Sequence, residues 1–127
     1  MRTIIESPGA PKAIGPYSQG IKIKANELIY LSGQIPLDPV SGHVVEGGVE
    51  AQAERVLENI TALLTAAGAK MTDVVKATMF LKDMNDFPKV NAIYSRYFPT
   101  NPPARSTIEV ARLPRDVLVE IEVIAAL

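Results

Sequence analysis

Near its C-terminal end the chain reads Pro102-Pro103-Ala104-Arg105-Ser106-Thr107-Ile108-Glu109-Val110, and a few residues later it reads Val117-Leu118-Val119-Glu120-Ile121-Glu122-Val123-Ile124-Ala125. Both runs are rich in β-branched residues and follow a proline, which predicts two β-strands. Successive side chains of a strand point to opposite faces of the sheet. In the second run every odd-numbered residue is apolar, so this row is predicted to face the hydrophobic core.

The opposite row of the second run carries two carboxylates, Glu120 and Glu122, between the apolar residues Leu118 and Ile124. We expect Arg105, in the first run, to share a sheet surface with these carboxylates. A charge on such a partly apolar surface requires a partner or a ligand. Two interpretations are open. One is a structural ion pair between Arg105 and a glutamate, and the other is an arginine that binds a ligand carboxylate beside a glutamate that handles water.

The rest of the chain predicts a mixed set of strands and helices. Alternation and turn residues indicate strands at residues 3–7, 19–24, 28–34 and 73–81, with a hairpin turn at 25–27 and a short extended piece at 43–45. Helical spacing of apolar residues predicts a helix at 49–67. A second helix is capped by Asp86, ends before Pro99 and has an inner stripe of Phe87, Val90, Tyr94 and Phe98.

The predicted order, β-β-β-α-β-α-β-β, is that of a single α+β domain spanning residues 1–127. Two amphipathic helices can cover one face of a mixed sheet, which gives a two-layer architecture. The other face of the sheet is then left uncovered, although it carries apolar residues such as Ile124. An exposed apolar face of this kind favours oligomerisation.

The composition excludes several classes of function. The 127 residues are 47% hydrophobic and 21% charged, as in an ordinary globular domain. A net charge of −1 leaves no basic excess for nucleic acid binding. The absence of cysteine excludes disulfides and thiolate chemistry, and it fits a reducing compartment. We find no signal peptide and no apolar run of about 20 residues, so we expect a cytoplasmic protein without membrane contact.

Metal and cofactor chemistry find little support in the sequence. The single histidine, His43, lies in a glycine-bounded loop and has no second ligand at metal-binding spacing. No glycine-rich phosphate loop follows a strand and opens a helix. We therefore expect neither a metal nor an organic cofactor.

Several separated segments of the chain together resemble one family. They are Ala13-Ile14-Gly15-Pro16-Tyr17-Ser18-Gln19-Gly20, Leu31-Ser32-Gly33-Gln34-Ile35-Pro36, Leu57-Glu58-Asn59-Ile60, Met84-Asn85-Asp86-Phe87, and Pro103-Ala104-Arg105-Ser106 with the Glu-Val-Ala-Arg-Leu-Pro and Val-Glu-Ile-Glu that follow it. In this order they are similar to the signature of the RidA (YjgF-type) family of 2-imino acid and enamine deaminases, over essentially the whole chain. The resemblance implies a chorismate-mutase-like fold and a homotrimer with three sites in the clefts between subunits.

The resemblance also implies roles for residues of this chain. Arg105 matches the arginine that binds the substrate carboxylate, and Glu120 matches the glutamate that positions the attacking water. Periodicity alone does not separate Glu120 from Glu122. Further substrate-binding residues implied in the same way are Tyr17, Ser32, Gly33, Asn91 and Thr107. Thr107 is a departure, because the family often has Cys at this position.

The function that the resemblance implies is hydrolysis of 2-iminobutanoate and 2-iminopropanoate to 2-keto acids and ammonia. Free imines already hydrolyse in water, so positioning and modest acid–base help are sufficient. An alternative is a module that binds a small keto acid without turnover, for which the second charge at Glu120 would bring nothing. A ribonuclease or translation inhibitor, an activity attributed to some relatives, is disfavoured by the charge balance.

Overall fold

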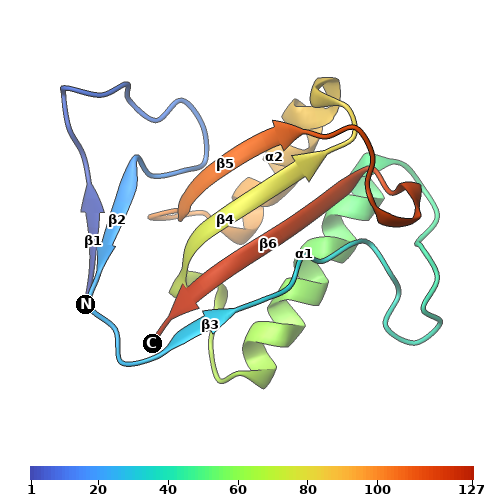
Figure 1. Cartoon of the computed structure of the whole chain (residues 1–127), viewed down its shortest axis with the longest axis horizontal. Coiled ribbons are helices and arrows are strands. Elements are labelled where there is room, and N and C mark those ends of the chain that lie inside the picture. Colours follow the sequence, from blue (N-terminus) through green and yellow to red (C-terminus); the bar gives the residue numbers. More distant parts are fainter.

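The computed structural model describes all residues from 1 to 127. Its strands are Arg2–Ile5 (β1), Gly20–Ile23 (β2), Leu28–Tyr30 (β3), Val74–Leu81 (β4), Ala104–Glu109 (β5) and Val119–Ala126 (β6). Its α-helices are Val49–Ala66 (α1) and Phe87–Tyr97 (α2), and short 3-10 turns span Met71–Asp73, Met84–Asp86 and Pro114–Asp116. Figure 1 shows the neighbouring strands β3, β4, β5 and β6 in front of the two helices.

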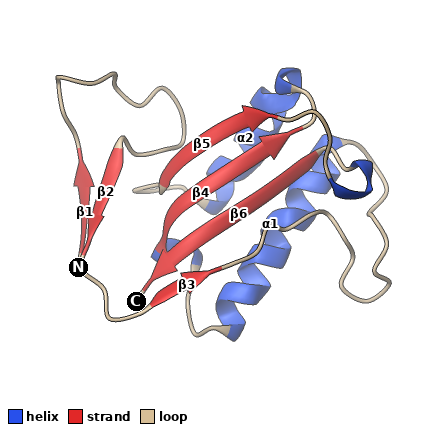
Figure 2. Cartoon of the chain, viewed as in Figure 1, coloured by secondary structure: helices blue, strands red, loops and turns tan.

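The main sheet has the strand order β3-β6-β4-β5. In it β4 pairs antiparallel with β6 and parallel with β5. Both helices pack on the same face of this sheet (Figure 2), and their apolar residues form one core with the buried residues of β4 and β6. The predicted α+β architecture, with two helices on one face of a mixed sheet, is confirmed.

The apolar periodicities of the sequence explain the core. Helix α1 buries the stripe that recurs at helical spacing, which consists of Val49, Ala53, Val56, Leu57, Ile60 and Leu64. The chain leaves this helix at Gly68, whose φ of 76° is a left-handed conformation that glycine adopts without strain. In β6 the alternate residues Val119, Ile121 and Val123 are buried, so the predicted core-facing row is confirmed.

The other face of the main sheet has no helix over it, and we call it the uncovered face (Figure 1). Strand pairing assigns to it Glu120, Glu122 and Ile124 of β6, Phe80 of β4, Ile108 of β5, and Leu28 and Tyr30 of β3. Tyr30, Leu28 and Ile108 are 68%, 52% and 45% exposed. Large apolar side chains gathered on one face favour contact with another protein surface. The predicted oligomer stays a prediction.

The predicted hairpin between the second and third strands is wrong. β2 pairs with β1 in a separate two-stranded sheet, whereas β3 pairs with β6. Both strands are short and half-exposed, so their alternation does not specify a partner. The guanidinium of Arg2 ties the small sheet to the main body, because it donates to the carbonyl oxygens of Thr72 at 2.6 Å and Asn101 at 2.8 Å.

Strand β3 is also shorter than predicted, because its pairing with β6 becomes irregular after Tyr30. Tyr30 lies opposite Ile124, and Gln34 lies opposite Ile121. Four steps along one chain segment thus match three along the other, as in a β-bulge. The irregular segment contains Ser32 and Gly33, and it brings Gly33 against Glu120.

Candidate functional site

Arg105 points to the helix-covered side of the sheet. It lies in β5 opposite Ala77 of β4, which in turn lies opposite Val123 of β6. Ala77 and Val123 are both buried in the core, so Arg105 belongs to the same row. Its Nη1 donates a hydrogen bond of 2.7 Å to Oδ1 of Asn91 in α2. The arginine and the asparagine that the sequence singled out are therefore in direct contact.

Three aromatic rings surround the guanidinium of Arg105. Their centroids lie 4.7 Å (Tyr94), 5.2 Å (Phe87) and 5.8 Å (Tyr17) from Cζ. Phe87, Asn91 and Tyr94 occupy positions i, i+4 and i+7 of one stripe of α2. Cation–π attraction and the hydrogen bond from Arg105 to Asn91 hold the guanidinium in one orientation.

Tyr17 reaches Arg105 from the irregular segment between β1 and β2. The next residue, Ser18, is buried, and its N–H donates to the carbonyl oxygen of Pro103 at 3.2 Å. Ser18 thereby pairs with Ala104 at the start of β5. This contact fixes the end of the segment next to the strand that carries Arg105, and it explains how a loop residue comes to lie beside the guanidinium.

No carboxylate of the chain neutralises Arg105. The ion pairs are Arg96–Glu54 and Arg112–Asp116, so the structural ion pair considered from the sequence is not formed within the chain. Burial lowers the pKa of Arg105, and nearby Tyr94 and Tyr17 oppose this effect. An arginine nevertheless remains charged in proteins. A half-buried guanidinium without a counter-charge favours the binding of an anion, and a carboxylate matches its planar fork.

Glu120 lies on the uncovered face, opposite Phe80 of β4. Its carboxylate covers Gly33, where an added Cβ would stand 1.9 Å from Oε2 and 2.9 Å from Cδ of Glu120. Burial raises the pKa of Glu120, and the negative charge of Glu122 raises it further. A carboxylate with a raised pKa is a stronger base than an ordinary glutamate, which suits the removal of a proton from water.

The predicted site residues therefore form two groups within one chain. The arginine group consists of Arg105, Tyr17, Asn91, Phe87 and Tyr94. The glutamate group consists of Glu120, Gly33 and the exposed Ser32. The expectation that Arg105 and the β6 carboxylates share one sheet surface is wrong. β4 separates the two strands, and the pairing aligns Arg105 with Val123 instead of a glutamate.

Thr107 lies two residues after Arg105 on the same strand face, opposite the buried Met79. Its hydroxyl oxygen is buried and has no hydrogen-bond partner in the chain. The sequence assigned Phe87 and Tyr94 only to the core stripe of α2, and so it missed their contact with Arg105. Their spacing from Asn91, four residues before it and three after it, is the signal that could have identified them.

The close approach at Gly33 leads to a testable prediction. In Gly33→Ala the new Cβ forces the Glu120 carboxylate out of its position, since the two groups would overlap. The flexible carboxylate can rotate away, so the melting temperature should change little. Under the role that the family resemblance implies for Glu120, such a misplacement should lower kcat of imine hydrolysis by about a hundredfold, and initial rates measure this loss.

The matched control is Gly9→Ala, because a Cβ at Gly9 meets only the hydroxyl of Ser7 at an ordinary 3.4 Å. This variant should keep the wild-type rate. If Gly33→Ala is fully active although its crystal structure shows the Glu120 carboxylate displaced, then Glu120 takes no part in the reaction.

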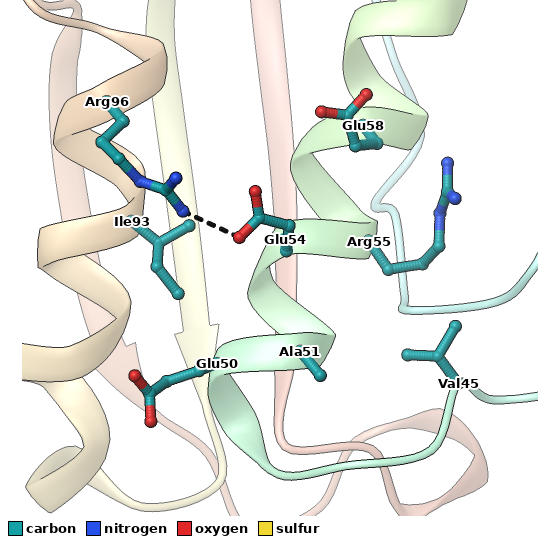
Figure 3. Close-up of a pocket in the computed structure, with 8 residues that line it drawn as sticks. All are labelled: Val45, Glu50, Ala51, Glu54, Arg55, Glu58, Ile93 and Arg96. Carbon is teal, nitrogen blue, oxygen red and sulfur yellow. Dashed lines mark hydrogen bonds and ion pairs between the residues drawn. The ribbon is translucent and has the colours of Figure 1, made fainter.

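A groove of about 470 Å³ lies between α1 and α2 (Figure 3). Its lining includes Glu54 and Arg96, which form an ion pair at 2.7 Å with side chains 46% and 61% exposed. The chain contains no group of histidine, aspartate and glutamate side chains that could hold a metal ion, and His43 is exposed. None of its helices has the length and apolar character needed to cross a membrane. None of the predicted site residues lines the groove between α1 and α2.

The chain is similar to known proteins over nearly its whole length. A family model described as endoribonuclease L-PSP matches residues 7–127. The chain is 53% identical to a RutC family protein of Pyrococcus horikoshii over 98% of both chains. It is 51% identical to the 2-iminobutanoate/2-iminopropanoate deaminase of Salmonella typhimurium, again over 98% of both chains. Among solved structures, E. coli TdcF with bound serine is similar with a TM-score of 0.76 and 42% identity, over 98% of both chains.

Proposed function

The chain belongs to the RidA (YjgF-type) family, which the endoribonuclease L-PSP model describes, and from this premise we propose that it hydrolyses reactive 2-imino acids. The substrates are 2-iminobutanoate, 2-iminopropanoate and their enamine tautomers, and the products are 2-keto acids and ammonia. Two relatives at about half identity carry the name of this deaminase, one from Salmonella typhimurium and one from Bos taurus.

The observation that carries the proposal is the unpaired guanidinium of Arg105. It is held by Asn91 and three aromatic rings and has no carboxylate partner. A 2-imino acid has a carboxylate next to the reacting carbon, and Arg105 binds this carboxylate through two parallel N–H donors. Binding at the carboxylate fixes the position of the imine carbon. The loss of motional freedom then occurs on binding and no longer adds to the barrier of the reaction. The serine bound to TdcF, a structural relative, also carries a carboxylate.

Glu120 supplies the acid–base chemistry in this proposal. Its carboxylate removes a proton from a water molecule while the water oxygen forms a bond to the imine carbon. It then returns this proton to the amine nitrogen of the tetrahedral intermediate. As the C–N bond breaks and ammonia leaves, the carboxylate takes the proton of the new hydroxyl group, whose oxygen becomes the carbonyl oxygen of the keto acid. One group can perform both steps because its raised pKa brings its protonation closer to neutral pH.

The two groups of site residues require a second copy of the chain to form one cleft. Arg105 and Glu120 lie on opposite faces of the same sheet, so one substrate cannot contact both within a single chain. We therefore propose that the arginine group of one subunit faces the glutamate group of the next. A head-to-tail contact closes into a ring when the rotation between neighbouring subunits allows it, and the ring that we propose is the homotrimer implied by family resemblance. The exposed apolar residues of the uncovered face favour this contact.

The remaining residues have supporting roles in the proposed cleft. Tyr17 packs over the substrate and Asn91 holds Arg105. Ser32 offers a hydroxyl, and Gly33 allows a close approach beside Glu120. Thr107 lies on the arginine side, where its strand contacts the bound carboxylate.

A specific experiment tests whether one cleft combines two subunits. Arg105→Ala and Glu120→Gln are each expected to be inactive, and the two variants are unfolded and refolded together in equal amounts. Random assembly gives about a quarter of the clefts both native residues if these come from different subunits, so activity should return to about a quarter of the wild-type rate. Each variant refolded alone is the control. A mixture that stays inactive, although native mass spectrometry confirms mixed oligomers, would place both residues in one chain.

The second candidate is a module that binds a keto acid without turnover. An unpaired Arg105 among aromatic rings would bind a carboxylate in either function, so it favours the deaminase and the module equally. The two functions differ in a direct assay. Threonine dehydratase generates 2-iminobutanoate in situ, and formation of 2-ketobutyrate is followed above the spontaneous rate. An acceleration that disappears in Arg105→Ala supports the deaminase. Binding of 2-ketobutyrate without acceleration supports the module.

A further inference from the structure

Asn59 lies inside α1, where asparagine is an unfavourable residue. An asparagine side chain competes with the helix for main-chain hydrogen bonds, and asparagine is therefore more common at helix ends and in turns. The neighbours Leu57 and Ile60 belong to the hydrophobic core, but Asn59 is only half-buried. Packing in the core thus does not account for an asparagine at this position, and the proposed function gives it no role.

The amide of Asn59 makes its hydrogen bonds outside the helix ladder. Its Nδ2 donates to the carbonyl oxygen of Leu37 at 3.0 Å and, more weakly, to that of Ile35 at 3.4 Å. Its Oδ1 accepts from Nε of Arg55, one helical turn earlier, at 3.0 Å. Because Arg55 occupies the oxygen, the NH2 group is oriented toward the two carbonyl oxygens. Asn59 therefore ties α1 to residues 31–37, the segment that follows β3 (Figure 1).

The contact between segment 31–37 and α1 depends strongly on this amide. A hollow of about 520 Å³ lies beside the contact, and its lining includes Gly33, Leu37 and Asn59, so apolar packing is incomplete here. The carbonyl oxygen of Leu37 has no other hydrogen-bond donor in the chain. Loss of the amide would leave this oxygen without a partner, which is unfavourable in a half-buried place, and the segment would be free to shift.

Segment 31–37 in turn touches Glu120. Gln34 forms an isolated bridge with Ile121 of β6, with main-chain hydrogen bonds of 2.8 and 3.2 Å. Gly33 directly precedes Gln34 and makes no main-chain hydrogen bond of its own, yet it lies directly under the carboxylate of Glu120. The position of Gly33 is therefore set by the contacts of the residues that follow it, and these contacts end at Asn59.

We propose that Asn59 is a positioning residue for Glu120. Its amide fixes segment 31–37 to α1, and Gly33 in this segment sets the place where the carboxylate of Glu120 lies. The inference rests on the proposed function, because it assumes that Glu120 performs the acid–base steps. Arg105 lies on the opposite face of the sheet, so Asn59 acts on the reaction and not on binding of the substrate carboxylate.

Asn59→Ala tests this role. Alanine is the best helix former, so α1 is kept and the melting temperature should change little. We expect kcat of imine hydrolysis to fall by about ten- to thirtyfold, because the carboxylate stays nearby but loses its fixed position. KM and the binding of 2-ketobutyrate, measured by calorimetry, should stay within about twofold of the wild type. A residue with a merely structural role would not separate kcat from binding in this way.

Two further variants sharpen the comparison. Asn59→Asp keeps the shape and the acceptor for Arg55 but has no N–H donors, so its kcat should fall at least as far as in Asn59→Ala. Thr61→Ala is the matched control on the same helix. The hydroxyl of Thr61 donates to the carbonyl oxygen of Leu57 within α1 at 2.8 Å, and its loss should leave kcat within about twofold of the wild type.

A double-mutant cycle shows whether Asn59 acts through Gly33 and Glu120. In Gly33→Ala the carboxylate of Glu120 is already displaced, so adding Asn59→Ala should slow the reaction by less than about twofold further. The residual rates are measured at raised enzyme concentration. Hydrogen exchange followed by NMR needs neither ligand nor turnover. The N–H of Gln34 should exchange about five- to tenfold faster in Asn59→Ala than in the wild type or in Thr61→Ala.

Three results would overturn the inference: wild-type kcat in both Asn59 variants, an additive loss of rate with Gly33→Ala, or unchanged exchange at Gln34. Failure of the proposed function looks different. If the wild-type protein hydrolyses no imine, the deaminase falls and the catalytic role of Asn59 falls with it. Faster exchange at Gln34 would still establish the tie between α1 and segment 31–37 in that case.

Discussion

Replacement of Arg105 by alanine is expected to lower kcat/KM for 2-iminobutanoate by about 150-fold or more, which corresponds to about 3 kcal/mol of transition-state stabilisation. Arg105 is the only cation of the structure that lies among aromatic rings, and it has no carboxylate partner. Its loss leaves the substrate carboxylate without a partner in a partly buried place. Initial rates above the spontaneous reaction measure the effect, and calorimetry with 2-ketobutyrate should detect the same loss of binding.

Arg105→Lys separates charge from geometry. Lysine keeps a positive charge but lacks the planar fork that donates to Asn91 and to both carboxylate oxygens, so most of the loss should persist. The control is Arg96→Ala, since Arg96 is 61% exposed and pairs with Glu54 at the groove between the helices. This variant should stay within about twofold of the wild-type rate because surface ion pairs contribute little. Wild-type binding of 2-ketobutyrate by Arg105→Ala would remove Arg105 from the site.

The parts of the fold that the sequence predicts well are those with one buried face. The odd-numbered row of β6 and the apolar stripe of α1 each repeat at a fixed period, and a shift by one residue would expose the whole row. The partners of β2 and β3 are not specified in this way. Both strands are short and half-exposed. The small sheet is fixed by a hydrogen bond from Arg2 to the carbonyl oxygen of Asn101, and these two residues are far apart in the sequence.

The candidate site is a similar case. Family resemblance identifies Arg105 and Asn91, and the structure brings them to 2.7 Å. Their relation to Glu120 depends on two pairings through β4, between strands far apart in the sequence. Alternation within each strand defines two rows but not which rows align, so the opposite placement of Arg105 and Glu120 could not be predicted. The contact of Phe87 and Tyr94 with Arg105 was not predicted, because these two residues also fit the apolar pattern of a helix that faces the core.

Glu120→Gln is expected to lower kcat by about a hundredfold or more, because it removes the general base and acid but keeps the shape of the side chain. Binding of 2-ketobutyrate should remain, since the carboxylate of the ligand is bound by Arg105. Removal of a negative charge near an anionic ligand should not weaken this binding. Calorimetry and initial rates on the same preparation measure both properties. A Glu120→Gln variant that turns over at the wild-type rate would remove Glu120 from the mechanism.

The pH dependence separates Glu120 from its neighbour Glu122. The carboxylate of Glu120 is active as a base when unprotonated, so kcat/KM should fall as the pH drops through its pKa. Burial and the charge of Glu122 raise that pKa, so the acid limb should lie at higher pH than for an ordinary glutamate. Glu122→Gln removes only the second and smaller cause. Its acid limb should therefore move partway to lower pH while the rate on the plateau stays the same. A loss of the plateau rate in Glu122→Gln, with Glu120→Gln active, would assign the chemistry to Glu122.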